Sequence, residues 1–410
     1  MPDDLADVII VGAGPAGVAT ALGLAGSGLK VFLLDKDQFP REKVCGGGLW
    51  LRSVRVLNDL LPNVGSNLQS YSNKTALCGI SVCTPEGSNF VYKSNFQGEE
   101  RKTLGYTVNR DDFDTWMVQQ AQKASEIRFF PASHVTQVKT TSTGVQVLGE
   151  GFNYQAKMLV FADGAQALAS SELSGMQFNR KADALAIRAY FKGVSTISED
   201  KVLEFCFLKE VYPGYLWLFP LNDDTVNVGL YLPLKYLGKQ KANLKNALFE
   251  LIQENSSLAC RFQDATLVGS IRGGLLPLGK SKVVLSGERY LIAGDAASLV
   301  DPLGGEGIGN ALYSGQLAAA HILKCFKTDN FSAAFNQTYD QQIHKSILND
   351  FGFRHWLIGF MKKHPGLFNY SVKKVSTNMA FRKMLANALA SGEIRKEMMS
   401  FRFFKNLIVK

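Results

Sequence analysis

Three glycines near the N-terminus have the spacing of a turn that binds phosphate. Gly12, Gly14 and Gly17 follow a β-branched strand predicted over residues 7–11 and precede an alanine-rich helix predicted over 18–27. Gly12 permits the tight turn, Gly14 lets the backbone approach a pyrophosphate, and Gly17 allows the helix to pack closely on the strand. The free N–H groups of the first helical turn then point at the phosphate. This segment predicts dinucleotide binding.

An acidic residue completes this unit. Asp35 follows the next predicted strand, residues 30–34, where its carboxylate can accept a hydrogen bond from a ribose hydroxyl. The glycines alone would fit a plain tight turn, but strand, glycines, helix, strand and aspartate together are specific. The unit does not separate FAD from NAD.

A second glycine-rich segment decides between the two cofactors. Residues 294–309 follow a predicted strand and lead into a helix predicted over 308–326. This segment resembles the G-D motif of the para-hydroxybenzoate hydroxylase superfamily. The resemblance implies that Asp295 hydrogen-bonds the ribityl chain of FAD and that Pro302 lies near the isoalloxazine ring. It also implies that the backbone of residues 307–309 meets the pyrimidine edge of the flavin.

Two shorter segments fit the same superfamily. Residues 161–165, after a predicted strand over 158–162, resemble its D-G motif, and Arg110 matches an arginine that approaches the cofactor pyrophosphate. Either alone could be a turn or a surface charge. A helix that begins near Ile308 would also place its positive end at the reduced flavin, a stabilisation of about 1 kcal/mol.

Two further segments resemble the geranylgeranyl reductase family. Residues 39–49 are similar to a loop of that family, and residues 212–220 resemble its aromatic motif. The fixed positions of that motif are Pro213, Tyr215, Trp217, Phe219 and Pro220. The resemblance covers roughly residues 5–345, and the remaining tail resembles no family that we can name.

The spacing and the resemblance together predict the residues that contact FAD. They are Gly12, Gly14, Pro15, Ala16, Gly17, Asp35, Lys36, Cys45, Gly46, Gly47, Arg110, Val135, Asp163, Gly164, Gly294, Asp295, Pro302, Gly305, Gly307, Ile308 and Gly309.

The aromatic residues of the second motif predict an apolar wall. Tyr215, Trp217 and Phe219 lie on one face of a strand, because side chains alternate with period two. Read alone, such a face is more often plain core packing. With a flavin nearby, we expect the three side chains to line the substrate pocket.

The resemblance implies the reaction. Geranylgeranyl reductases saturate isoprenoid double bonds with hydride from reduced FAD, so we expect an apolar or lipid-like substrate. Such a substrate is bound mainly through its apolar area, about 0.8 kcal/mol per buried methylene. The sequence has no second glycine motif for NAD(P)H, so either NAD(P)H or a reduced carrier protein could donate the electrons.

Cys45 is the candidate catalytic residue, as proton donor or gate, because it precedes three glycines in the predicted cofactor loop. A small buried side chain without catalytic role is the alternative.

Three other activities stay open. An aromatic monooxygenase and a flavin-dependent halogenase use the same fold, and a non-catalytic FAD-binding protein would keep only the cofactor. Halogenases carry W-x-W-x-I-P where this chain has Tyr-Leu-Trp-Leu-Phe-Pro at 215–220, which argues against halogenation.

The composition of the chain excludes several classes of protein. The 410 residues, 46% of them hydrophobic, suffice for more than one domain. The six cysteines form no C-x-x-C pair and the five histidines do not cluster with them, so we expect reduced thiols and no metal site. We see no signal peptide or membrane-spanning stretch, and we expect a cytoplasmic protein.

The basic charge lies in the tail. Residues 351–410 carry a net charge of +10, against −1 for residues 1–350. A globally basic chain would suggest nucleic acid, whereas a basic tail rich in aromatic residues suggests contact with a membrane surface. The alternative is that the tail packs on the body as a structural cap.

The predicted fold is α/β plus α+β. We expect a Rossmann-type FAD-binding domain with an inserted antiparallel-sheet substrate domain and a helical C-terminal region. The expected FAD-binding parts are 1–70, 105–175 and 285–345, the substrate domain is 71–104 and 176–284, and the basic helical region is 346–410.

Overall fold

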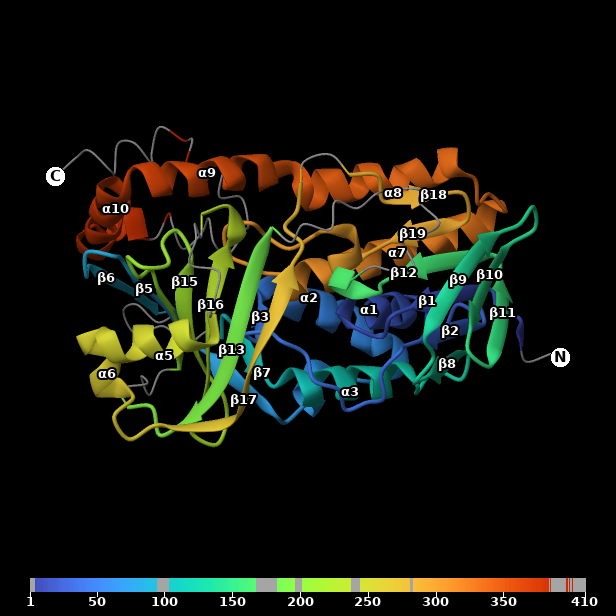
Figure 1. The fold of residues 1–410 in the computed structure, drawn as a ribbon. Coiled ribbons are helices and arrows are strands. Elements are labelled where there is room, and N and C mark those ends of the chain that lie inside the picture. The colour runs from blue at the N-terminus through green and yellow to red at the C-terminus, as the bar shows by residue number, and fades with distance from the viewer. Residues whose placement is uncertain are drawn as a thin grey trace.

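The computed structural model describes most of the chain. The described residues are 4–93, 103–166, 183–195, 201–236, 244–280 and 283–382, together with 384, 396, 398 and 400. Figure 1 shows two halves side by side, each built on its own large sheet, with C-terminal helices running along the top. The predicted combination of a Rossmann-type domain, a second sheet and a helical C-terminal region is confirmed.

The first half is built on a six-stranded sheet whose inner strands are parallel. In order of pairing, its strands are β18 (Ser286–Gly287), β19 (Tyr290–Ile292), β12 (Met158–Phe161), β1 (Val8–Val11), β2 (Val31–Leu34) and β8 (Ile127–Phe130). Only the pairing of β18 with β19 is antiparallel. Both faces of the central strands are buried in one hydrophobic core, which explains why β1, β2 and β12 are uninterrupted apolar runs.

Helices α1 (Pro15–Leu24), α3 (Arg110–Ala121), α2 (Leu51–Leu60) and α7 (Ile308–Thr328) belong to this half. Helix α1 begins three residues earlier than predicted, because proline is favoured in the first helical turn. Small residues bring α1 and α7 together: a Cβ added at Gly315 would lie 2.2 Å from the carbonyl oxygen of Ala16. Helix α1, which begins within the predicted phosphate turn, is therefore packed closely against α7.

Two small antiparallel sheets and several short helical turns complete this half. One sheet pairs β3 (Gly48–Trp50), β7 (Gly105–Val108) and β4 (Lys74–Leu77), and the other pairs β9 (Val135–Thr140), β10 (Val145–Gly149) and β11 (Phe152–Ala156). Among the described residues, its 3₁₀ turns are η2 (Leu61–Val64), η3 (Leu68–Ser70), η4 (Gly164–Gln166) and η7 (Gly294–Ala297). Two more, η5 (Leu234–Tyr236) and η8 (Leu348–Asp350), lie in the second half and in the C-terminal region. Strand β4 lies in the range assigned to the substrate domain, yet it pairs with β7 of the FAD-binding range. The exact domain boundaries stay a prediction.

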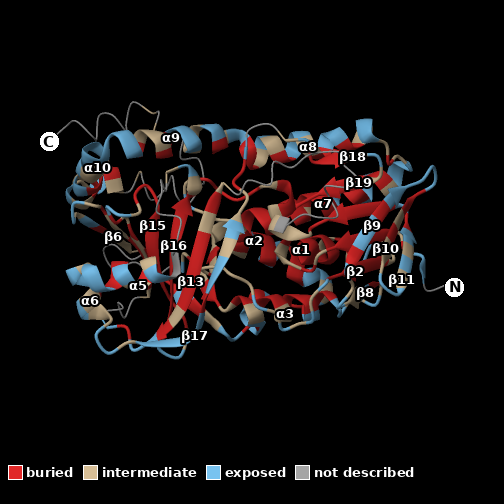
Figure 2. Cartoon of the chain, in the orientation of Figure 1, coloured by how far each residue is buried: buried red, intermediate tan, exposed pale blue. Residues whose placement is uncertain are grey.

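The second half is a seven-stranded, mostly antiparallel sheet. In order of pairing, its strands are β17 (Thr266–Leu276), β13 (Ala184–Lys192), β16 (Thr225–Pro233), β15 (Tyr215–Pro220), β14 (Val202–Cys206), β5 (Gly79–Cys83) and β6 (Asn89–Lys93). Helices α5 (Leu244–Glu254) and α6 (Ser256–Arg261) pack against one face. The other face carries the aromatic residues, and its strands β13, β15 and β16 are mainly buried, whereas the edge strand β17 is largely exposed (Figure 2).

The C-terminal region is helical as far as it is described. Helices α8 (Ala333–Ser346), α9 (Phe351–Lys363) and α10 (Pro365–Thr377) follow α7. Figure 1 shows α9 above the second half and α10 beside β6. Most of the predicted basic region beyond residue 382 lies outside the described residues. No described helix is both long and apolar enough to span a bilayer.

Candidate functional site

The turn after β1 has the backbone geometry of a close approach. Gly12 has a φ of +102°, and a Cβ there would lie 2.2 Å from the carbonyl oxygen of Ala162, which follows β12. A Cβ at Gly17 would lie 1.8 Å from the carbonyl oxygen of Gly12, so neither position has room for a side chain. A Cβ added at Gly14, the N-cap of α1, would lie 3.5 Å from its nearest neighbour, a guanidinium nitrogen of Arg41. No side chain caps this end of the helix. The first-turn N–H groups of α1 are thus left available to an anion.

Asp35 is committed to the backbone around this turn. One carboxylate oxygen accepts a hydrogen bond from the N–H of Ala13 at 2.7 Å, and the other accepts from the N–H of Asp37 at 3.0 Å. The carboxylate therefore braces the glycine turn, and a ribose hydroxyl would have to share it. Lys36 points to Asp37, 3.4 Å away, and is half exposed.

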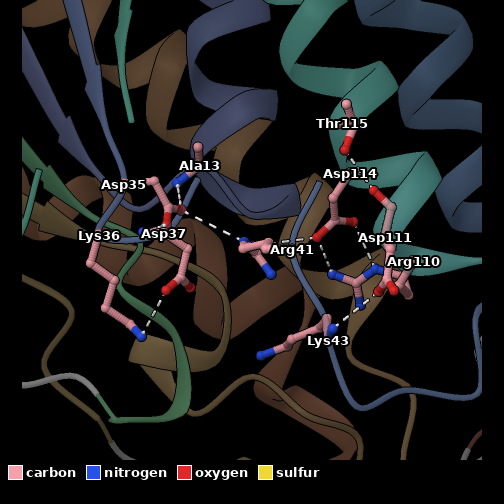
Figure 3. A network of polar contacts seen from close by, with 10 residues as sticks. All are labelled: Ala13, Asp35, Lys36, Asp37, Arg41, Lys43, Arg110, Asp111, Asp114 and Thr115. Carbon is pink, nitrogen blue, oxygen red and sulfur yellow. Dashed lines mark hydrogen bonds and ion pairs between the residues drawn. The ribbon is translucent and has the colours of Figure 1, made fainter. Parts of the chain in front are cut away.

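Arg41 was not predicted as a site residue, yet it lies at the centre of this network (Figure 3). Its guanidinium is 3.3 Å from Asp114 and 4.0 Å from Asp35, and its Nε has no hydrogen-bond partner although it is buried. The proximity to Gly14 places a positive charge beside the N-terminus of α1. The signal was present in the loop of residues 39–49, but only the fold shows which of its charges turns toward the glycines.

Arg110 is buried and already paired. Its guanidinium donates two hydrogen bonds to Asp114, at 2.7 and 2.8 Å. Burial lowers the pKa of Arg110, but Asp114 and the Cys45 sulfur outweigh it and hold that pKa above its ordinary value. The Cys45 sulfur also accepts from the N–H of Gly47 at 3.4 Å. Arg110 therefore links α3 to the cysteine loop.

The ends of three parallel strands meet at the same edge of the first sheet. Gly12 follows β1, Asp163 follows β12, and Gly294 follows β19. A Cβ at Gly294 would lie 2.8 Å from the Cβ of Ala16, and the N–H of Gly294 donates to the Ser314 hydroxyl at 3.0 Å. Ligands of open α/β sheets bind at this carboxyl edge.

Other predicted contacts lie near this edge or on a neighbouring sheet. Gly164 opens η4 with a φ of +77°, and η4 packs against η7. Val135 is buried as the first residue of β9, in the small sheet β9–β11. Asp295, in η7, has its carboxylate 4.0 Å from the ammonium of Lys43.

The loop between η7 and α7 is held by two tyrosines of the other half. The Tyr215 hydroxyl donates to the carbonyl of Gly304, and the Tyr231 hydroxyl donates to the carbonyl of Pro302, each at 2.6 Å. Asp301 accepts from the N–H groups at the two positions after Pro302, at 2.7 and 2.9 Å. Burial raises the pKa of both tyrosines, so their hydroxyls stay protonated donors.

Glu306 was also missed as a site residue. Its Oε1 has no hydrogen-bond partner, and a Cβ at Gly309 would lie 2.4 Å from that oxygen. Burial raises the pKa of Glu306, while the positive charge of Arg52 opposes the shift. Helix α7 begins beside Glu306. Its N-cap residue is Gly307, and no side chain hydrogen-bonds to this end of the helix.

The predicted aromatic wall lies against both glycine loops. Tyr215, Trp217 and Phe219 are buried in one cluster. A Cβ at Gly46 would lie 2.8 Å from the Phe219 ring, and the Trp217 indole donates to Asn227 at 2.9 Å. The Asn227 amide in turn donates to the carbonyl of Cys45 at 2.9 Å. Together with the tyrosine bonds, these contacts join the second sheet to the predicted cofactor loops.

Comparison with known proteins identifies the family. The profile of the FAD binding domain matches residues 5–345. A menaquinone reductase from Mycolicibacterium smegmatis is 31% identical over 341 residues, which cover 80% of this chain and 79% of that relative. A digeranylgeranylglycerophospholipid reductase from Methanococcus vannielii is 26% identical and covers 98% of both chains. The chain belongs to the geranylgeranyl reductase family of FAD-dependent oxidoreductases.

Solved structures agree on the fold. A geranylgeranyl bacteriochlorophyll reductase-like protein from Thermoplasma acidophilum superposes with a TM-score of 0.76 at 23% identity, covering 99% of this chain and all of that one. A flavin-dependent brominase has a TM-score of 0.71 at 21% identity and covers 96% of this chain and 98% of the other. At these identities the two structures show a common fold and no common activity.

The site of this geranylgeranyl reductase family member fits FAD. Two helices, α1 and α7, present N-termini that no side chain caps, and the Arg41 guanidinium lies beside the first. Such groups suit a pyrophosphate at α1 and the electron-rich edge of a flavin at α7. Within the described residues, no group of His, Cys, Asp and Glu side chains could hold a metal ion.

Proposed function

We propose that this protein uses FAD to reduce carbon–carbon double bonds of an isoprenoid or similar apolar, lipid-like substrate. The observation that carries the proposal is the aromatic wall, which lies against two loops with predicted FAD contacts, the loop of Cys45 and the loop between η7 and α7. Relatives named menaquinone reductase and digeranylgeranylglycerophospholipid reductase support a reductase of large apolar molecules. When bound, FAD supplies the hydride.

The chain's own residues bind and orient the substrate. Trp217 is fixed by Asn227, and Phe205 packs edge-on against both Tyr215 and Phe219, at 5.3 and 5.4 Å between ring centroids. An alkene offers no polar group to hold, so buried apolar area must position it and exclude water.

Cys45 stays our candidate for the proton donor that supplies the second hydrogen to the double bond. Its sulfur is close enough to Arg110 to affect the pKa of that residue, and the Asn227 amide fixes its carbonyl. A purely structural thiol is the alternative. Alkene reduction by Cys45→Ala with pre-reduced FAD separates the two, because an undiminished chemical step removes Cys45 from the mechanism.

The electron donor is proposed to be NAD(P)H or a reduced carrier protein. Mixing oxidised, FAD-loaded protein with either donor under argon and following the loss of flavin absorbance tests this choice. Bleaching by one donor at a catalytically useful rate identifies it, and bleaching by neither contradicts both.

We also propose that α9 and α10 contact an anionic membrane surface. Rings of Phe353, Trp356 and Phe360 stack along α9 at 5.5 and 5.2 Å between centroids, and Trp356 is 57% exposed. The His364 ring, just after α9, lies tilted 4.7 Å from that of Phe360. Exposed Lys363 and Lys373 lie on the same two helices. An aromatic and basic surface of this kind suits an interface with anionic lipid.

The structure narrows the set of residues available for that contact. Four apolar side chains of α9, Phe351, Leu357, Ile358 and Met361, are buried and are therefore not available for insertion into lipid. Lys383, a basic residue of the tail, lies outside the described residues. Vesicle sedimentation tests the contact: binding should require anionic lipid, weaken with salt, and fall in Trp356→Ala but not in the control Trp116→Ala, which removes a partly buried tryptophan on α3. Binding that ignores lipid charge and salt, or no binding, contradicts it.

The reduction itself is tested with a polyprenyl substrate and chemically reduced FAD. The product should gain two hydrogens per reduced double bond, as measured by mass spectrometry. An unchanged substrate for every isoprenoid offered, with FAD bound and reduced, contradicts the proposal.

A further inference from the structure

The segment that runs from η7 to the start of α7 contains three acidic side chains, and two of them have a basic partner. The carboxylate of Asp295 lies 4.0 Å from the ammonium of Lys43, and Asp301 pairs with the guanidinium of Arg354 on α9. The third acid is Glu306, and no described basic side chain forms an ion pair with it. Glu306 is therefore the acid of this segment whose charge is not compensated by a close cation.

The carboxyl group of Glu306 lies beside the first turn of α7. A Cβ at Gly309 would lie 2.4 Å from Oε1 of Glu306 and 3.1 Å from Oγ of Ser53 on α2. Both oxygens are buried without a hydrogen-bond partner, and Ser53 is 0% exposed. A hydroxyl can donate to a carboxylate or accept from a carboxylic acid, so such a neighbour suits an acid that changes its protonation state.

Arg52 is the positive charge that acts on Glu306, but its hydrogen bond goes elsewhere. The Arg52 guanidinium donates to the amide oxygen of Asn310 at 2.5 Å and lies 5.5 Å from the Tyr313 ring centroid. Burial raises the pKa of Glu306, and the charge of Arg52 opposes this rise. The free N–H groups at the start of α7 also favour a negative charge nearby. Burial thus favours the neutral acid, whereas Arg52 and the helix favour the ionised one.

The redox state of FAD bears on this balance. The chain matches the FAD binding domain over residues 5–345, and the uncapped start of α7 suits the electron-rich edge of the flavin. A carboxylate and a reduced flavin at one helix N-terminus are like charges in a site shielded from water, and they repel each other. An ionised Glu306 is therefore less stable beside reduced FAD than beside oxidised FAD.

We propose that Glu306 is a redox-linked proton acceptor, which binds a proton from solvent when FAD is reduced and releases it when FAD is reoxidised. The reductant gives two electrons to the flavin, which takes up its own proton, and one further proton converts the Glu306 carboxylate into the neutral acid. This role requires bound FAD but no particular substrate, so it goes beyond the proposed function.

The midpoint potential of FAD in the loaded protein, measured against pH without substrate, counts these protons. Between the pKa of Glu306 beside oxidised FAD and its higher pKa beside reduced FAD, the potential of the wild type should fall more steeply with pH than that of Glu306→Gln. The difference should equal one proton for each two electrons. Arg52→Met should move this interval to higher pH, because the charge that opposes protonation is lost. Glu254→Gln, which changes an exposed acid at the end of α5, is the matched control and should follow the wild type.

Infrared difference spectra, reduced minus oxidised, give a second readout that the wild type alone can provide. Within the same pH interval, a carboxylic-acid C=O band should appear in the wild type and in Glu254→Gln but not in Glu306→Gln. If Glu306→Gln does not retain FAD, the absence of this band from the wild type overturns the assignment.

Three further results would overturn it. One is the same dependence of the potential on pH in the wild type and Glu306→Gln, and another is a carboxylic-acid band that persists in Glu306→Gln. The third is a change of potential in Glu306→Gln that is equal at every pH, which would make Glu306 a structural neighbour only. Redox-linked proton uptake by a protein that reduces no alkene would instead contradict the proposed function alone.

Discussion

Tyr231→Phe should loosen the loop that joins the second sheet to the flavin site. The Tyr231 side chain is 2% exposed, and its hydroxyl donates to the carbonyl of Pro302 at 2.6 Å. The substitution removes one oxygen atom and leaves that carbonyl buried without its donor, at a cost of about 1–3 kcal/mol. Tyr215→Phe removes the bond to the carbonyl of Gly304, two residues along the loop, but Gly304 is exposed, so water can replace the donor and the cost should be smaller. Because the two bonds hold one loop, their losses should not be additive.

Urea unfolding of the FAD-loaded variants measures the loss of stability, and flavin fluorescence of released FAD measures retention. If the lost hydrogen-bond free energy destabilises only the FAD-bound protein, the Kd for FAD should rise by about a factor of ten for each 1.4 kcal/mol. Tyr154→Phe, on the distant strand β11, is the control for removal of a tyrosine hydroxyl. Wild-type unfolding and wild-type FAD retention in Tyr231→Phe would refute the idea that this hydroxyl holds the loop.

Three further predictions concern the cofactor, the wall and the buried acid. Asp295→Ala should weaken FAD retention by about 1.5–3 kcal/mol, measured by dialysis against apoprotein, because a charged acceptor for a ribityl hydroxyl is lost; unchanged retention contradicts that role. Trp217→Ala should raise KM for long prenyl chains more than for short ones, since a contact counts only when the chain reaches it, whereas equal effects indicate core packing. Burial raises the pKa of Glu306, so its protonated form favours folding, and this stability is lost as pH rises through the pKa of the folded state. Glu306→Gln should therefore gain stability over the wild type in urea unfolding as the pH rises above the ordinary pKa of a glutamate, and a difference that does not change with pH would contradict this.

The local sequence pattern was sufficient to predict the turns and strands that carry the site. The glycine turn after β1, the strand that precedes Gly294 and the strand of Tyr215, Trp217 and Phe219 all occur where spacing and alternation predicted them. These features depend on neighbours within a few residues, which a sequence displays directly.

Partners distant in sequence could not be predicted in this way. Arg41 meets Asp114 only because α3 folds beside the loop that follows β2. Tyr231 reaches Pro302 across 71 residues, and the pairing of Arg188 with Trp217 through Gly229 depends on the register of three strands. The tail shows the same limit, since its apolar residues are divided between buried and exposed faces by the surface they pack on.

Anaerobic turnover is the most direct test of the central claim that this protein is an alkene reductase. The assay uses FAD-loaded protein, a polyprenyl substrate and a stoichiometric chemical reductant, with and without oxygen. We expect the same hydrogenated product in both, with one substrate double bond reduced for each reduced FAD consumed under argon. A reaction that requires oxygen, or a product that contains an added oxygen or halogen atom, would contradict the account.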